Sequence, residues 1–524
     1  MRDEKGQIVV MAIFLLMILF SLAGLVVDLG KIYSIHQELK NACDAASLAG
    51  AFELPNSEKA KEVALEYASK NKVLEEEVEV TTPYTDKLIE ERGFPSTSCI
   101  KVKVTRDVKL FFAKLFGLKT CKVKAESVAS FPFFSVRWKF DTGQEVHGTP
   151  VVYKGVLYAV NTDDFYKGQV YALEPETGKE IWHTQVYGAI QETPYIVNDT
   201  IYFATLSGWF YALDLSGNVK WRVYTKEALR NVYPGGRNQC HWISSSPTYL
   251  NGIIYIGSHS YDYNRSEWDM DDGGLYAISA TTGNFVDQAC LPGPIYSSPV
   301  IVNNILYVGC SDGNMYAINI RPNGTFTRGG NPYRPDIKWK YQTGGEVSST
   351  PCVWNGKVYF GSDDNKIYCL DALTGAKIWS YETPPPQGSG PYLPRLNYVG
   401  SGKVSDKGIL HIGDGGGWVY ALDAETGVLK WKRKLAKYSI EGSPCLAHGV
   451  VYYGADNRDA GGKAGMYHAL SEDTGKILQS YNIGYDTHNS PIATEDWIYF
   501  GADDHKVYGV KITPPEGIYA RLIE

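Results

Sequence analysis

A unit of about 40–53 residues recurs from residue 137 to about residue 513, and this repetition restricts the fold more than any other feature of the chain. One clear copy runs from Ser349 to Trp379 and contains, in order, Thr-Pro, Asn-Gly, Tyr-x-Gly and Thr-Gly-x-x-x-Trp. An eighth copy near Gly402 lacks the Ser/Thr-Pro pair but keeps the later motifs. The six other copies are centred on Pro150, Pro194, Pro247, Pro299, Pro444 and Pro491.

Each copy predicts four short β-strands. The first strand follows the Pro, whose missing N–H is tolerated where a strand begins. Asn-Gly and similar pairs then accept the positive φ that a tight hairpin needs, as at Asn251 and Gly252. The second strand carries Tyr-x-Gly, the third ends in Ala-Leu-Asp, and the fourth follows a Thr-Gly turn and ends in Trp. Four strands per repeat is the organisation of a β-propeller, so we expect a mainly β fold with eight blades over 137–513.

The two ends of the repeat region predict how the ring closes. The last copy stops after Ile512 and lacks the Thr-Gly-x-x-x-Trp strand. The missing piece stands at the opposite end of the region, where Trp138 precedes a Thr-Gly pair. We therefore expect strand 136–140 to complete the last blade, which removes the exposed strand edges that promote aggregation. Residues 514–524 are left as a tail.

The N-terminal part predicts a membrane anchor. Ile8 to Val27 contains no charged residue, and a helix of this length spans about 30 Å, the thickness of a bilayer core. No A-x-A cleavage site follows, which favours an uncleaved transmembrane helix within residues 1–30 over a secretory signal peptide. We expect a single-pass protein of the cytoplasmic (inner) membrane, with its N-terminus inside and its bulk extracytoplasmic, in the periplasm or at the cell surface.

Residues 31–130 predict a small α/β module with a resemblance to a known family. The leader Lys5-Gly6-Gln7, the alanine-rich segment 41–51 and a strand–FFAKLFG–strand pattern around 111–117 resemble the TadE/TadG-like proteins of tight-adherence (Flp) pilus assembly. The resemblance implies protein partners in a pilus, secretion or envelope assembly. In pilins a peptidase cuts after a glycine such as Gly6, and the fifth residue after that glycine is Glu. Here that position is Met11, which favours a retained anchor.

The Ala-Leu-Asp-x-x-Thr-Gly-x-x-x-Trp pattern resembles the tryptophan-docking motif of the pyrroloquinoline-quinone-like (PQQ-like) propellers. This superfamily includes quinoprotein alcohol dehydrogenases and the outer-membrane assembly factor BamB. The resemblance implies a structural role for the docking residues, which lock one blade to the next. They are Trp138, Trp182, Trp221, Trp339, Trp379 and Trp431; the third and seventh repeats lack this residue.

The same resemblance raises the question of a cofactor. Quinone-dependent dehydrogenases of this family carry two adjacent cysteines, a calcium ion and a catalytic Asp, whereas this chain has no Cys-Cys pair. We therefore predict no catalytic residues and no bound PQQ. One loop gathers carboxylates that suit calcium, although the spacing is not that of an EF-hand, and a solvated acidic loop is the alternative. These residues are Asp262, Glu267, Asp269, Asp271 and Asp272.

Long connections predict the binding face. They fall at 222–243, 258–273, 380–397 and 456–465, largely on one side of the expected propeller, and loops that lengthen on a rigid repeat often carry binding. Neutral surface growth is the alternative. The candidate contact residues are Arg237, His241, Trp242, Tyr261, Tyr263, Trp268, Tyr392 and Arg395.

Nine cysteines leave at least one thiol outside any pair within the chain. Most lie at strand-like positions, where cysteine acts as a small buried apolar residue. Cys99 and Cys121 each open one of the two strands around the FFAKLFG segment, so we expect a disulfide bond between them in an oxidising compartment.

A non-catalytic role follows as the leading hypothesis. The formal net charge of -7 and pI near 5.9 argue against a nucleic-acid-binding surface. We expect a membrane-anchored binding or scaffolding protein of pilus assembly, surface adhesion or secretion, with the propeller as its recognition head. The alternatives are a PQQ- or metal-dependent oxidoreductase and a BamB-like scaffold for envelope protein assembly.

Overall fold

The computed structural model divides into two compact units, one of residues 1–133 with 513–524 and one of residues 134–512. The described residues are 2–51, 53–54, 57–85, 99–130, 134–163, 166–225, 242–259, 273–326, 335–385, 398–437, 439–456, 465–485, 487–512 and 521–522.

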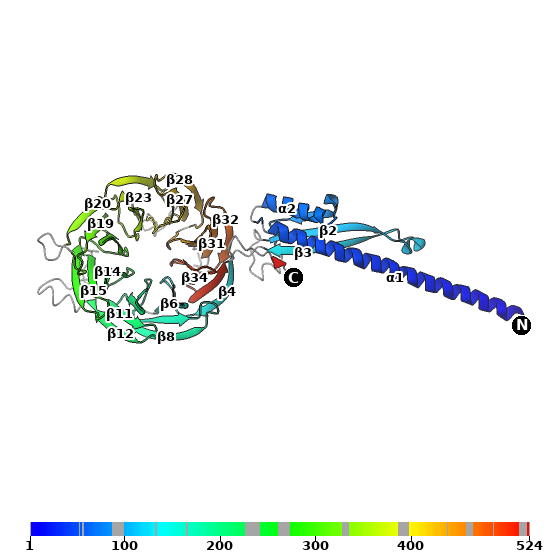
Figure 1. Ribbon diagram of the computed structural model, residues 1–524, viewed down its shortest axis with the longest axis horizontal. Helices are drawn as coiled ribbons and strands as arrows, with labels where there is room; N and C mark the ends of the chain where they lie inside the picture. Colours follow the sequence, from blue (N-terminus) through cyan, green and yellow to red (C-terminus); the bar gives the residue numbers. More distant parts are fainter. Residues whose placement is uncertain are drawn as a thin grey trace. The chain divides into compact units, whose positions relative to one another are not determined.

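The described strands of the second unit form eight four-stranded antiparallel sheets, which follow one another around a ring (Figure 1). The first sheet comprises β5 (Val151–Tyr153), β6 (Val156–Asp163), β7 (Lys167–Leu173) and β8 (Glu180–Tyr187). The second comprises β9 (Tyr195–Val197), β10 (Thr200–Ala204), β11 (Trp209–Asp214) and β12 (Val219–Tyr224). The third comprises β13 (Thr248–Leu250), β14 (Ile253–His259), β15 (Gly273–Ser279) and β16 (Phe285–Leu291). The fourth comprises β17 (Val300–Val302), β18 (Ile305–Gly309), β19 (Asn314–Asn319) and β20 (Ile337–Gln342).

The remaining sheets repeat the pattern. The fifth comprises β21 (Cys352–Trp354), β22 (Lys357–Ser362), β23 (Lys366–Asp371) and β24 (Lys377–Glu382). The sixth comprises β25 (Lys403–Val404), β26 (Ile409–Gly413), β27 (Trp418–Asp423) and β28 (Leu429–Lys434). The seventh comprises β29 (Cys445–Ala447), β30 (Val450–Ala455), β31 (Met466–Ser471) and β32 (Ile477–Asn482). The eighth comprises β33 (Ile492–Ala493), β34 (Trp497–Ala502), β35 (Lys506–Ile512) and β4 (Phe134–Asp141).

The eighth sheet contains both ends of the unit. β4 comes first in the chain but pairs with β35, and Trp138 lies opposite Gly509. This is the pairing expected of strand 136–140. The chain therefore passes between the two units at 133–134 and again at 512–513.

A β-bulge recurs at the same point of all eight sheets, between the third and fourth strands. In the fifth sheet, for example, Cys369 lies opposite Trp379, and the register then shifts by one residue. Bulges bend a strand and re-aim its side chains. The position opposite the bulge is the one that carries the docking tryptophan in six of the sheets.

Each of these six indoles reaches the next sheet. Trp339, for example, donates its Nε1–H to the carbonyl of Ala372 at 3.0 Å, and the same carbonyl accepts the hydroxyl of Tyr307 at 2.9 Å. The ring covers Gly375, at φ +73°, where an added Cβ would lie 2.6 Å from the indole. The other donor–acceptor pairs are Trp138 to Pro175, Trp182 to Leu215, Trp221 to Ala280, Trp379 to Ala424 and Trp431 to Glu472, at 2.7–3.1 Å.

The first unit consists of helices that pack on a small sheet. Its sheet has the order β1 (Val78–Thr81), β2 (Cys99–Lys109), β3 (Thr120–Ser130) and β36 (Arg521–Leu522), so residues expected to form only a tail add a short edge strand. The helices are α1 (Arg2–Ala51), α2 (Ser57–Lys70) and the short 3₁₀ helices η1 (Glu75–Glu77) and η3 (Ala113–Phe116).

Small side chains bring α1 close to α2 and to the sheet. Ala42 and Ala46 of α1 and Ala60, Ala64 and Ala68 of α2 are all buried in one core with valines of β2 and β3. Among the described residues, α1 is also the one helix long and apolar enough to cross a membrane, with an 18-residue window of mean hydropathy 2.6.

The prediction of a disulfide bond between Cys99 and Cys121 is wrong. In the hairpin of β2 and β3, Cys99 lies opposite Ser130, whereas Cys121 lies opposite Val108. The nine steps from Cys99 to Val108 along β2 correspond to about 30 Å, while a disulfide bond requires Cα atoms within about 7 Å. Cys99 is the first residue of β2 and Cys121 the second residue of β3, and in an antiparallel hairpin the starts of the two strands lie at opposite ends.

Candidate functional site

Most of the predicted binding face lies outside the described residues. Trp242 alone among the candidate contact residues is described, while the rest fall within 226–241, 260–272 and 386–397. The five carboxylates of the proposed calcium loop also lie outside the described residues, between 260 and 272.

Trp242 belongs to an aromatic cluster at the base of the loop that follows β14. Its backbone exchanges two hydrogen bonds with His259, at 3.3 and 3.0 Å, and the two rings are 5.8 Å apart. The imidazole of His259 lies 4.7 Å from the ring of Tyr296, and its Nδ1 is 3.0 Å from the hydroxyl of Ser244. Burial lowers the pKa of His259 to about 4, so this cluster is uncharged at neutral pH.

Serine and threonine hydroxyls link the first strands of neighbouring sheets. These residues stand just before a first strand, in most sheets directly before the Pro. In six cases the backbone N–H of one residue donates to the hydroxyl of its counterpart in the next sheet. Six such bonds, at 2.7–3.2 Å, join Thr193 to Ser246, Ser246 to Ser298, Ser298 to Thr350, Thr350 to Ser401, Ser443 to Ser490 and Ser490 to Thr149. The last bond crosses from the eighth sheet to the first, so this polar ring also fastens the closure.

Charged residues gather beside the same ring where the seventh, eighth and first sheets meet. His488 lies 2.6 Å from Glu441 and 3.1 Å from Asp503, while His147 lies 3.1 Å from Glu145 and 3.5 Å from Asp503. Burial disfavours the protonated form of His488, but hydrogen bonds to Asp503 and Glu441 outweigh it and raise its pKa to about 11. Protonated His488 therefore forms ion pairs with Glu441 and Asp503, and the seam cluster as a whole joins three sheets.

Two further carboxyl groups of the ring have pKa values raised to near neutral pH, so each is partly protonated there. Burial raises the pKa of Glu192 to about 7, even though Ser246 donates a hydrogen bond to it at 3.3 Å. Burial, together with the charges of Glu346 and Asp364, raises the pKa of Asp363 to about 7. Such groups can accept or donate a hydrogen bond to a polar ligand at neutral pH.

Three buried cysteines of the ring have thiols that resist ionisation. Burial raises the pKa of Cys445 to about 11 and that of Cys369 to about 12, and it raises the pKa of Cys310 further. A thiol must be ionised to act as a nucleophile, so these side chains are inert packing groups at neutral pH. Among the described residues, no group of three or more His, Cys, Asp or Glu side chains is arranged to hold a metal ion.

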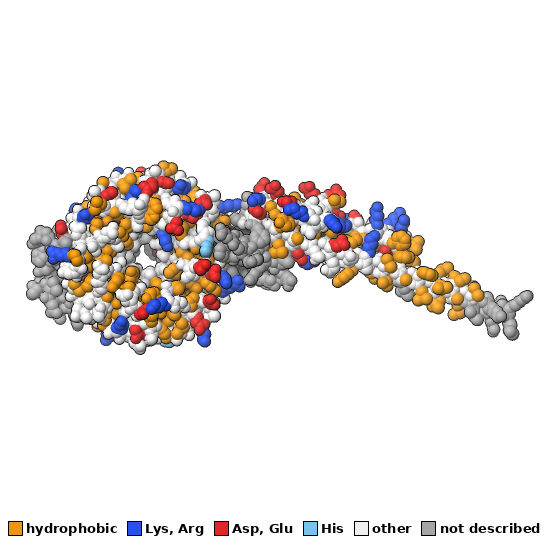
Figure 2. Space-filling model, in the orientation of Figure 1, with side chains coloured by type: hydrophobic (Ala, Val, Ile, Leu, Met, Phe, Trp, Pro, Cys, Tyr) orange, Lys and Arg blue, Asp and Glu red, His pale blue; other side chains and the backbone are white. Residues whose placement is uncertain are grey.

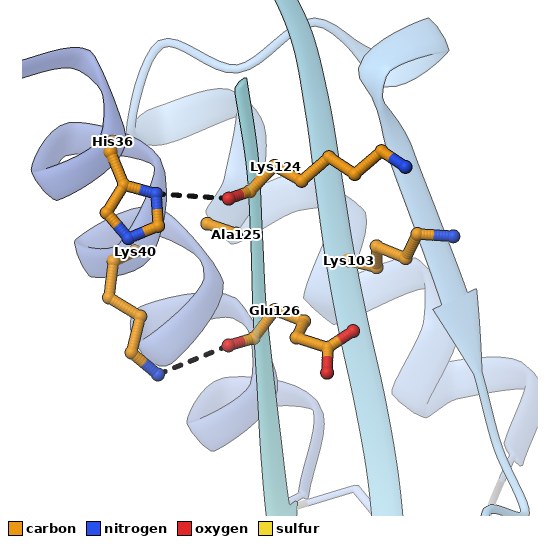
Figure 3. Close-up of a pocket in the computed structure, with 6 residues that line it drawn as sticks. All are labelled: His36, Lys40, Lys103, Lys124, Ala125 and Glu126. Carbon is orange, nitrogen blue, oxygen red and sulfur yellow. Dashed lines mark hydrogen bonds between the residues drawn. The ribbon is translucent and has the colours of Figure 1, made fainter. Parts of the chain in front are cut away.

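A cavity of about 290 Å³ lies in the first unit, between α1 and the β2–β3 hairpin (Figure 3). His36 donates from Nδ1 to the carbonyl of Lys124 at 3.0 Å, and Lys40 donates to the carbonyl of Glu126 at 3.2 Å. Lys103, which also lines the cavity, forms an ion pair with Glu79 at 2.9 Å. His36 and Lys40 therefore attach α1 to β3, while Lys103 joins β2 to β1.

Sequence reasoning missed the seam cluster and the hydroxyl ring. His147 and His488 stand 341 residues apart, but both lie close before a Ser/Thr-Pro pair, in the first and last repeats. A closed ring places these two repeats side by side, so the closure predicted from Trp138 contained the signal that would have paired the two histidines.

Three family models match the chain. One described as outer membrane protein assembly factor BamB matches 135–326 and 335–512. A Flp pilus-assembly TadE/G-like model matches 6–52, and a Tad-like Flp pilus-assembly model matches 34–129. The two resemblances named from sequence motifs are thereby confirmed.

Individual proteins with known names are similar to the propeller part. The chain is 22% identical over 347 residues to the outer membrane protein assembly factor BamB of Moranella endobia, which covers 63% of this chain and 76% of that protein. It is 33% identical over 144 residues to the dehydrogenase subunit of a quinone alcohol dehydrogenase of Gluconobacter oxydans, which covers 26% of this chain. That match spans only 18% of the dehydrogenase subunit.

A solved structure agrees on the fold. The crystal structure of BamB from Moraxella catarrhalis superposes with a TM-score of 0.52 at 14% identity and covers 72% of this chain and 100% of that chain. At this level of identity the likeness concerns the fold alone.

Proposed function

Because the chain belongs to the BamB family of PQQ-like propellers over 135–512, with TadE/G-like sequence before it, we propose that it is a membrane-anchored scaffold of Tad-type pilus assembly or secretion. The propeller is its recognition head and performs no catalysis. The eight four-stranded sheets are the eight blades of this head, and β4 with β35 closes it.

The observation that carries this proposal is the joining of the two kinds of sequence in one chain. The TadE/G-like part holds the apolar stretch of α1, and the propeller has its ends next to each other in the eighth sheet, where Phe134 lies opposite Ile512. Two chain segments rather than one connect the head to the anchoring unit. In this proposal the N-terminus remains in the cytoplasm and the apolar stretch of α1 crosses the inner membrane. The rest of the first unit and the propeller lie on the extracytoplasmic side.

The partner face is proposed on the long loops 222–243, 258–273, 380–397 and 456–465. Support comes from the aromatic cluster of Trp242, His259 and Tyr296, which lies at the base of two of these loops. Aromatic side chains are enriched in protein interfaces, and an uncharged cluster can be buried without the cost of desolvating an ion.

A deletion tests this function. Because residues 521–522 pair with β3, removing 134–512 and joining 133 to 513 deletes the head but leaves the anchoring unit complete. We expect this variant to reach the membrane and to fail in pilus assembly or secretion in the organism that encodes the chain. Unchanged piliation, secretion and surface adhesion would contradict the proposal.

A pull-down distinguishes a scaffold of pilus assembly from a BamB-like scaffold of envelope protein assembly. Full-length protein in nanodiscs is incubated with envelope extract and compared with a variant in which Trp242 and Tyr296 are replaced by Ala. Capture of Tad-system proteins that the variant loses supports the pilus role. Capture of outer-membrane proteins instead would support a BamB-like role in envelope protein assembly.

A PQQ- or metal-dependent oxidoreductase is the second candidate, favoured by the 33% identity to the quinone alcohol dehydrogenase subunit. Two carboxylates of the seam cluster, Glu441 and Asp503, do not fit the role of calcium ligands, since both are already paired with His488. Reconstitution with PQQ and calcium, followed by alcohol oxidation with a dye acceptor, decides between the two. Calorimetry with calcium alone tests the acidic loop, and no heat and no thermal shift would remove that site.

A further inference from the structure

The tip of the β2–β3 hairpin, residues 110–119, exposes a cluster of large apolar side chains. The exposed fractions are 73% for Phe111, 79% for Leu115, 70% for Phe116 and 62% for Leu118. Single exposed apolar residues are common, but a contiguous group of this size marks an interaction surface.

Three attachments fix this hairpin tip to α1. The carboxylate of Asp28, which is 3% exposed, accepts the backbone N–H groups of Phe111, Phe112 and Ala113 at 2.8, 2.9 and 2.7 Å. The ring of Phe112 packs on Gly24, where a Cβ would lie 2.3 Å from it. Lys31 donates to the carbonyl of Lys109 at 2.9 Å.

These attachments fix the position of the tip along α1 relative to its apolar stretch. Asp28 is the first charged residue after the charge-free run from Ile8 to Val27. Gly24 lies within that run, about 6 Å along the helix axis from Asp28. The tip is therefore held at the end of the segment that would cross the bilayer, beside the exposed Leu25, Val26 and Val27. Figure 2 shows hydrophobic side chains covering α1 towards its N-terminal end.

The charge around the tip matches one kind of surface. Residues 108–124 contain five lysines and no Asp or Glu. Lys109, Lys114 and Lys119 flank the apolar residues, and Lys31 of α1 lies beside them. Apolar residues bordered by lysines are the composition of interfacial membrane segments, and the lysines favour anionic lipid headgroups.

We propose that residues 110–119 are a second membrane-contacting element, which inserts Phe111, Leu115, Phe116 and Leu118 into the interface of the same bilayer that α1 crosses. The surrounding lysines contact anionic phospholipid headgroups. The inference rests on the proposed membrane anchoring. With two attachment points, the anchoring unit is fixed in tilt and rotation, which a single helix does not achieve.

Photolabelling tests this element in the full-length protein. The protein is placed in nanodiscs that contain phosphatidylglycerol and a phospholipid with a diazirine in its acyl chain, and the labelled peptides are mapped by mass spectrometry. We expect acyl-chain adducts on α1 and on 110–119. Leu74 is also apolar, is 59% exposed and belongs to the same unit, and its peptide should remain unlabelled.

A variant pair adds a matched control. Replacing Phe111, Leu115, Phe116 and Leu118 with Ser should reduce labelling of the tip at least tenfold and leave labelling of α1 unchanged, whereas Leu74→Ser should change neither. Replacing phosphatidylglycerol with phosphatidylcholine should lower labelling of the wild-type tip.

The outcomes separate this inference from the anchoring proposal. A labelled α1 with an unlabelled tip in the wild-type protein overturns the inference and leaves the anchor intact. An unlabelled α1 overturns both. Crosslinks from the tip to a protein, with no lipid adducts, would identify the tip as a protein-docking surface and also overturn the inference.

Discussion

At the scale of single residues, Asp28 holds the tip of the β2–β3 hairpin against α1. One carboxylate accepts three successive N–H groups of the hairpin tip. We expect Asp28→Ala to leave these donors without a protein acceptor and to accelerate hydrogen exchange at residues 111–113. Asp28→Asn keeps one acceptor oxygen and should give an intermediate rate. Equal exchange in all three proteins would show that the tip is held without this side chain.

The docking tryptophans make a second prediction at this scale. Trp339→Phe removes the donor to Ala372, although that carbonyl keeps the hydroxyl of Tyr307. The lost hydrogen bond and the smaller ring should lower the free energy of unfolding by about 1–3 kcal/mol. Arg222 lies over the ring of Trp209, which is only partly buried at the edge of the core between the first and second sheets. Trp209→Phe keeps an aromatic ring there and should cost less than about 1 kcal/mol. Urea denaturation measures both; equal costs would argue against blade docking.

Buried His411 predicts how stability depends on pH. Burial lowers its pKa from 6.5 to about 3, so the folded state binds fewer protons than the unfolded state between these values. Its contribution is therefore present above about pH 6.5 and is lost as the pH falls towards 3. We expect the difference in Tm between pH 7 and pH 5 to shrink in His411→Gln. A pH dependence identical to that of the wild type would assign the acid sensitivity to other groups.

The candidate site was predictable only in part, and the reason lies in how its residues come together. Trp242 was found because it stands in a long loop, which a sequence displays directly. The pairing of His147 and Asp503 depends on ring closure, and the burial that raises the pKa of Glu192 depends on the packing of neighbouring sheets. Neither property is local in sequence.

At the scale of elements, the turns between third and fourth strands decide how sheets meet. Gly375 has φ +73° and lies under Trp339, so Gly375→Ala forces both backbone strain and a clash with the indole. Gly252 has φ +86° with nothing within 4 Å of an added Cβ, so Gly252→Ala tests strain alone. We expect Gly375→Ala to lower the free energy of unfolding by about 1–3 kcal/mol more than Gly252→Ala. Similar losses would mean that the indole moves aside freely.

The four strands of each repeat and the closing strand were predictable because motif order and turn chemistry are written locally. The sequence shows that two repeats lack the docking tryptophan, but it does not show why. In the seventh sheet Gln479 takes the tryptophan position, and its neighbour, the eighth sheet, has no turn between third and fourth strands, because these are β35 and β4. In the third sheet Asp287 takes the position and accepts the N–H of Phe326 at 2.8 Å, while Phe326 packs against Tyr255.

The disulfide prediction failed at the element scale as well. Cys99 and Cys121 are both first residues of predicted strands, and proximity was inferred from the neighbouring strands alone. The antiparallel register, which the hairpin connection imposes, separates them along the sheet. Strand pairing must therefore be combined with strand direction before cysteines are matched.

At the scale of the whole molecule, the position of β4 determines what can fold independently. Both strands of the closing pair belong to the second unit, so fragment 134–512 contains every described strand of the ring. We expect this fragment to be a soluble monomer whose thermal transition matches that of the head in the full-length protein. Fragment 142–512 differs only by the loss of β4, which removes Trp138 from Gly178 and leaves β35 as an open edge. It should aggregate or unfold at a clearly lower temperature, as measured by size-exclusion chromatography and calorimetry. If the shorter fragment were equally stable and monomeric, the closure would not hold the ring together, and the double connection between head and anchor would need another explanation.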